Sequence, residues 1–149
     1  MKNRTVAQAI IAIALIVNSS LHAAGPEITV YKTPTCGCCA KWVEHLKENG
    51  FSVTVHEVSN TAEYRQKYGV PENLRSCHTA VVGGYAIEGH VPVREIQRLL
   101  KTAPKAKGLA VPGMPSGSPG MEGARSDPYT VLLFDDKGET TAFQKYPAK

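Results

Sequence analysis

The chain has 149 residues, a formal net charge of +4 and charged side chains at 20% of its positions. This length fits one domain with a modest hydrophobic core. The positive excess is small and no basic run concentrates it, which argues against nucleic acid and against a charged membrane surface as partners.

The first 25 residues have the pattern of a secretion signal. Lys2 and Arg4 give a basic start, an apolar run covers residues 6–17, and small residues precede the expected cleavage site. An uncleaved anchor is the alternative, but the run is shorter than the roughly 20 residues that a membrane-spanning helix needs. We therefore expect residues 1–25 to be removed and residues 26–149 to act in the periplasm, without membrane attachment.

The mature segment is predicted to begin with a strand, a helix, a second strand and a second helix. A β-branched run predicts the first strand at residues 28–32. Apolar residues at helical spacing follow Thr35, and Asn49-Gly50 ends this helix because glycine tolerates the left-handed geometry of a helix end. Alternation predicts the next strand over residues 51–58, and a short helix follows. Asn60 or its neighbour Ser59 is the expected cap of that helix.

A hairpin and a third helix complete this part of the chain. The segment "RSCHTAVVGGYAIEGHV" predicts two strands joined at Gly83-Gly84. Pro92 then opens a helix that Pro104 closes. The order β-α-β-α-β-β-α is that of a thioredoxin-like α/β sandwich, in which the reactive cysteines lie between the first strand and the first helix.

Two further segments extend this plan. Residues 107–128 are rich in Gly, Pro and Ser and are predicted to be a long loop, either disordered or functional. Residues 129–147 are predicted to form a C-terminal β-hairpin, which turns at residues 135–138.

Cysteines carry the strongest chemical signal. Cys36, Cys38 and Cys39 form a CxCC motif at the start of the first helix, where unpaired N–H groups favour thiolate over thiol. Cys77 precedes the third strand, which faces that point in a thioredoxin-like fold. We expect four sulfurs to converge on a metal site. Soft, closely spaced thiolates favour Cu(I), and zinc is also possible.

Two other interpretations use the same cysteines. Cys36 and Cys39 have the CxxC spacing of a thiol-disulfide oxidoreductase that acts on protein substrates. A non-catalytic module with two disulfides, Cys36–Cys39 and Cys38–Cys77, is also compatible with four cysteines. The sulfur of Cys38 distinguishes these interpretations, because a simple dithiol enzyme has no need of it.

Weaker ligand candidates flank the expected site. They are His78, His90, Met114 and Met121. Anchoring of the loop over an apolar patch is the alternative for the methionines. His45 and His56 are expected to be solvated. Glu88 is expected to be a surface carboxylate, with an outer partner of His90 as the alternative.

Three motifs together resemble one known family. "YKTPTCGCCAKWVEHL", "SCHTAVVGGYAIEGHVP" and "GLAVPGMPSGSPGME" are similar to the CopG-type family of periplasmic, thioredoxin-like metal-binding proteins, long described as a domain of unknown function. The resemblance implies a secreted protein of copper resistance that binds copper through its four cysteines and interconverts Cu(I) and Cu(II). Copper ions and other periplasmic copper-handling proteins are the implied partners.

Overall fold

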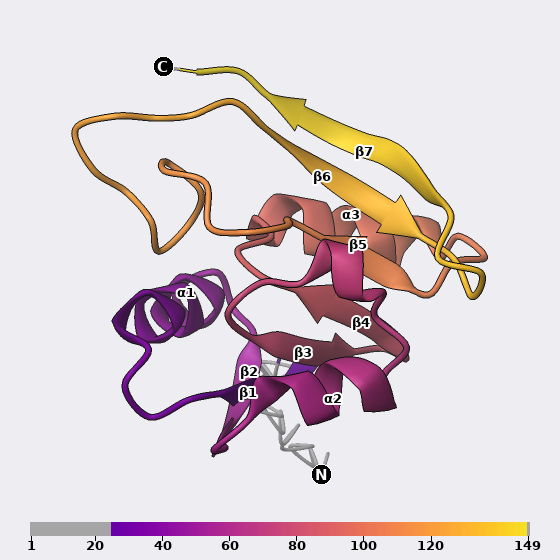
Figure 1. Ribbon diagram of the computed structural model, residues 1–149, viewed down its shortest axis with the longest axis horizontal. Coiled ribbons are helices and arrows are strands. Elements are labelled where there is room, and N and C mark those ends of the chain that lie inside the picture. Colours follow the sequence, from indigo (N-terminus) through magenta and orange to yellow (C-terminus); the bar gives the residue numbers. More distant parts are fainter. Residues whose placement is uncertain (1–24, 149) are drawn as a thin grey trace, which may run out of the picture.

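The computed structural model describes residues 25–148, so the predicted signal segment lies almost wholly outside the described residues. One seven-stranded sheet runs in the order β2-β1-β3-β4-β5-β6-β7 (Figure 1). The elements are β1 (Glu27–Lys32), α1 (Gly37–Glu48), β2 (Ser52–Glu57), α2 (Thr61–Lys67), a 3-10 turn (Glu72–Leu74), β3 (Thr79–Val82), β4 (Tyr85–Glu88), α3 (Val93–Thr102), β5 (Gly108–Ala110), β6 (Tyr129–Phe134) and β7 (Thr140–Tyr146).

The predicted thioredoxin-like order is confirmed. Strand β1 pairs parallel with β2 and antiparallel with β3, and β3 and β4 form the predicted hairpin at Gly83-Gly84. The side chain of Asn60 caps α2 by accepting a hydrogen bond from the backbone N–H of Ala62. The C-terminal hairpin of β6 and β7 is also present.

One strand was not predicted. Within the segment expected to be a loop, residues Gly108–Ala110 form β5, which pairs parallel with β4 and antiparallel with β6. The C-terminal hairpin therefore extends the central sheet instead of covering it. The intervening chain, residues 111–128, leaves β5 and returns to β6 past the start of α1 (Figure 1).

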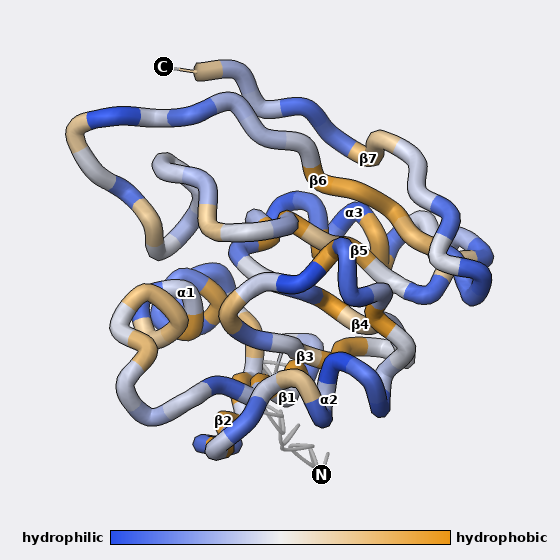
Figure 2. Tube along the Cα trace, in the orientation of Figure 1, coloured by the Kyte–Doolittle hydropathy of each residue, from blue (hydrophilic) through white to orange (hydrophobic). Residues whose placement is uncertain are grey.

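The sheet is covered on both faces near its centre. The larger core cluster joins apolar side chains of α1 and α3, among them Trp42 and Ile96, to one face of the sheet. A smaller cluster on the other face includes Leu74 and Phe134. Most residues of β6 are apolar, whereas its edge neighbour β7 is largely hydrophilic (Figure 2). Because β4 lies between both layers, its last residues are buried whichever way they point.

Within the described residues, no helix combines the length and the apolar composition that crossing a membrane requires.

Candidate metal centre

The start of α1 presents three of the cysteines. Cys36 is the N-cap, in an extended conformation and without a side-chain cap, and Cys38 and Cys39 lie in the first turn. Cys36 and Cys39 are joined by a disulfide, whereas Cys38 is free with its Sγ 3.5 Å from that of Cys36. The predicted CxxC pair is therefore bonded, and Cys38 lies directly against it.

Cys77 completes the cluster from the loop that precedes β3. The ligand atoms of all four cysteines lie within 4.8 Å of one another, although 38 positions separate Cys39 from Cys77. Cys77 is a free thiol, so the second disulfide of the two-disulfide interpretation, Cys38–Cys77, is not formed. Burial, followed by the nearby Cys38, raises the pKa of the Cys77 thiol to about 12. A metal ion bound by this sulfur would have to displace that proton.

Two buried histidines lie beside Cys77. The Sγ of Cys77 is 3.3 Å from Nδ1 of His78 and 3.0 Å from Nε2 of His90, and these three residues form a second group of ligand atoms within 4.8 Å. His90 donates its Nδ1–H to the carbonyl of Pro119 at 2.8 Å. That bond fixes the tautomer and leaves a lone pair on Nε2 toward the sulfur, as in many metal-ligating histidines.

His78 also has an unprotonated nitrogen. Burial, together with the neighbouring His90, lowers the pKa of His78 to about 3. Its Nε2 is buried and has no hydrogen-bond partner within residues 25–148. Neutral imidazole nitrogen and thiolate sulfur are ligands that copper and zinc accept, so the residues present, once their thiols are deprotonated, fit such an ion.

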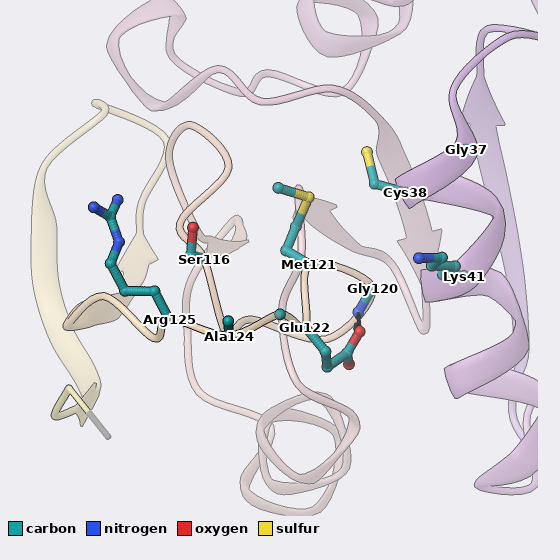
Figure 3. A pocket seen from close by; sticks show the side chains of 10 residues that line it. Gly37, Cys38, Lys41, Ser116, Gly120, Met121, Glu122, Ala124 and Arg125 are labelled. Atoms are coloured by element: carbon teal, nitrogen blue, oxygen red, sulfur yellow. Dashed lines mark hydrogen bonds between the residues drawn. The ribbon is translucent and has the colours of Figure 1, made fainter.

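A cleft of about 680 Å³ leads to the cluster between α1 and the segment of residues 111–128. Cys38 and Lys41 line one side, and Met121 and Glu122 line the other (Figure 3). Met114, by contrast, is 53% exposed and does not line this cleft. The structure thus brings one predicted methionine to the same cleft as Cys38 and leaves the other at the surface.

Two sequence expectations about polar residues are wrong. His45 is half-buried, and its Nε2 accepts a hydrogen bond from the backbone N–H of Val93 at 3.3 Å. Glu88 is fully buried and its carboxylate accepts hydrogen bonds from Ser76 and Thr79. A charged residue at the end of a largely apolar strand was the signal available for Glu88. His56 is exposed, as expected, and stacks on Tyr31.

Two family models match the two halves of this site. A glutaredoxin model matches residues 28–69, which include the CxCC motif, and a model described as protein of unknown function DUF411 matches residues 74–121, which include Cys77. No curated protein sequence matches the chain.

The chain is also similar to two solved structures, described as copper resistance protein CopG, form 2 and form 1. Both are 43% identical to it, with TM-scores of 0.78 and 0.77. They cover 82% and 81% of this chain, which spans 98% and 97% of theirs. The likeness therefore includes the C-terminal hairpin as well as the thioredoxin-like part.

Proposed function

Because this chain belongs to the CopG family of copper resistance proteins, we propose that it binds copper through Cys36, Cys38, Cys39 and Cys77. The observation that carries this proposal is the convergence of four sulfurs within 4.8 Å from two separate segments. A structural pair would use two of these sulfurs, so the cluster calls for a ligand.

Cu(I) is the form of copper that this donor set favours. Thiolates are soft ligands and select Cu(I), whereas the usual zinc spacings have two separated pairs of cysteines. His78 and His90 are weaker candidates. His90 is supported by the lone pair of Nε2 toward the Cys77 sulfur, and His78 by Nδ1 at 3.3 Å from that sulfur and by its buried Nε2 without a hydrogen-bond partner in the described residues. Met121 is supported by its place in the cleft; Met114 has no such support.

Four sulfur ligands become available only after an external thiol or other two-electron reductant converts the Cys36–Cys39 disulfide to two thiolates, or to two thiols when two protons are also taken up. In the opposite direction, oxidation of the two thiols to the disulfide releases two electrons and two protons, enough to reduce two Cu(II) ions to Cu(I). Redox interconversion of copper at this site is therefore part of the proposal. We place it in the periplasm, in copper resistance, with other periplasmic copper-handling proteins as exchange partners.

Anaerobic Cu(I) titration of the reduced mature protein tests the proposal. We expect tight binding by the wild type and its loss when all four cysteines are replaced with serine, because a hydroxyl is a poor ligand for Cu(I). The comparison is made by competition with a chromophoric Cu(I) chelator. Equal affinities of the two proteins would rule out the cysteine cluster as the copper site.

A thiol-disulfide oxidoreductase is the second candidate. The glutaredoxin model match and the Cys36–Cys39 disulfide at the start of α1 favour it. In that case the protein should catalyse the reduction of insulin disulfides, and Cys36→Ser should abolish turnover because the attacking thiolate is lost. A wild-type protein without turnover in this assay eliminates the candidate.

A further inference from the structure

A single buried carboxylate holds the segment that carries Cys77 and His78. Oε1 of Glu88 accepts a hydrogen bond from the backbone N–H of Ser76 at 2.7 Å, and Oε2 accepts one from the hydroxyl of Thr79 at 2.6 Å. Ser76 and Thr79 are the residues on either side of the Cys77-His78 pair. The two oxygens of one side chain therefore fix both ends of a four-residue segment.

The carboxylate of Glu88 lies in the protein interior, where an ionised group is unfavourable unless it is paired. Glu88 lies at the end of β4 and is fully buried, and burial raises its pKa, against the hydrogen bonds from Thr79 and Ser76 and the charge of Arg65. Arg65 reaches it from α2, with Nη1 3.5 Å from Oε1, and is itself 6% exposed. An isolated buried charge is strongly unfavourable, whereas a paired and fully hydrogen-bonded one is tolerated.

This network replaces regular secondary structure at the site. Ser76, Cys77 and His78 lie between the 3-10 turn and β3, so the sheet does not hold them directly until Thr79. One backbone bond, from the N–H of Gly89 to the carbonyl of His78, is formed there. The hydroxyl of Ser76 also donates to the carbonyl of Gly113. Without the carboxylate, the backbone N–H of Ser76 and the hydroxyl of Thr79 would both lose their acceptor.

We propose that Glu88 is a positioning residue for the metal centre, which sets the place of the Cys77 sulfur and the His78 ring through Ser76 and Thr79. Its connection to copper rests on the proposed function. The positional part can be tested without metal, because Cys38 and Cys77 are the two free cysteines of the described residues.

Glu88→Gln is the decisive variant. Glutamine keeps the size of the side chain but carries no charge, so the ion pair with Arg65 is lost. Its amide nitrogen cannot accept the hydrogen bond that the Thr79 hydroxyl donates to Oε2 in the wild type. We expect Cys77 in the metal-free, disulfide-intact protein to be alkylated roughly tenfold faster, the factor for losing one charge-assisted hydrogen bond. Cys38, on α1, should react at the wild-type rate. Cu(I) affinity should fall roughly 10- to 100-fold, as is typical when an outer partner of a ligand is lost.

Glu95→Gln is the matched control. Glu95 is also fully buried and hydrogen-bonded, but its partners are Tyr146 of β7 and, on its own helix α3, Arg94 and Arg98. The same chemical change there should leave the alkylation rate of Cys77 and the Cu(I) affinity unchanged. If Glu95→Gln reproduces both effects, or if Glu88→Gln produces neither, the positioning role is wrong.

The two proposals fail in different ways. A wild-type protein that binds no Cu(I) refutes the proposed function, while alkylation rates measured by mass spectrometry still decide the role of Glu88. Should Glu88→Gln not fold, Thr79→Val removes one of its two hydrogen bonds and keeps its pairing with Arg65. Faster alkylation of Cys77 alone then supports the proposal, and unchanged rates at both thiols overturn it.

Discussion

Replacing Cys38 with serine is expected to weaken Cu(I) binding by the reduced protein by more than the roughly 100-fold that follows loss of an outer partner, because a direct sulfur ligand is exchanged for a poor one. The Cys36–Cys39 pair does not involve this sulfur, so it should still form its disulfide. Turnover in the insulin assay, if the wild type has any, should persist. Cys38 thereby separates metal binding from dithiol chemistry.

Ala40→Ser is the control for this experiment. Position 40 is an exposed position on the same helix, two residues after Cys38, and gains the same hydroxyl. It should bind Cu(I) as the wild type does in an anaerobic competition titration. A Cys38→Ser protein that competes as well as the Ala40→Ser protein would show that Cys38 is not a copper ligand.

Gly120→Ala should be among the most destabilising substitutions near the site. Gly120 has a φ of +86°. A Cβ there would come within 2.7 Å of the Cys38 carbonyl oxygen and 2.9 Å of the backbone nitrogen of Trp42. Strained backbone and overpacking together are expected to lower the free energy of unfolding by about 3 kcal/mol. Relief of the clash moves the neighbouring Pro119 carbonyl away from His90, so Cu(I) affinity should fall as well.

Gly113→Ala isolates the backbone component of this effect. Gly113 also has a positive φ, +69°, but a Cβ there meets no atom within 4 Å. Gly113→Ala should lower the free energy of unfolding by about 1 kcal/mol, the cost of the left-handed conformation alone. Urea unfolding of both metal-free variants measures the difference. Equal losses would mean that the close approach of Gly120 to α1 contributes nothing to stability.

Features with a local cause were predictable from the sequence. The position of α1 follows from the break at Thr33-Pro34-Thr35 before it, with Cys36 as the N-cap, and from Asn49-Gly50 after it. The β3–β4 turn follows from Gly83-Gly84. The convergence of Cys77 with the CxCC motif followed from the predicted topology and is confirmed. That these residues bind copper remains a prediction.

Features with a distant cause were missed. Strand β5 has three residues in a segment rich in glycine and proline, too few for alternation to show, and it exists because β4 and β6 lie on either side of it. Glu88 was expected at the surface because an alternating strand pattern assumes one solvent-exposed face of the sheet, whereas β4 is covered on both faces. The partner that makes its burial tolerable, Arg65, comes from a helix 23 positions earlier in the chain.

The place of β5 has a consequence for the thermodynamics of binding. Residues 111–128 leave the sheet at Ala110 and rejoin it at Tyr129, and in between Pro119 and Gly120 contact His90 and α1. Both ends of this segment are fixed when the sheet forms, and backbone hydrogen bonds inside it, such as that from Gly117 to Met121, order the chain between them, so this conformational entropy is lost on folding. An ion that enters the cleft meets a segment already ordered, and little of its binding free energy is spent on ordering the chain.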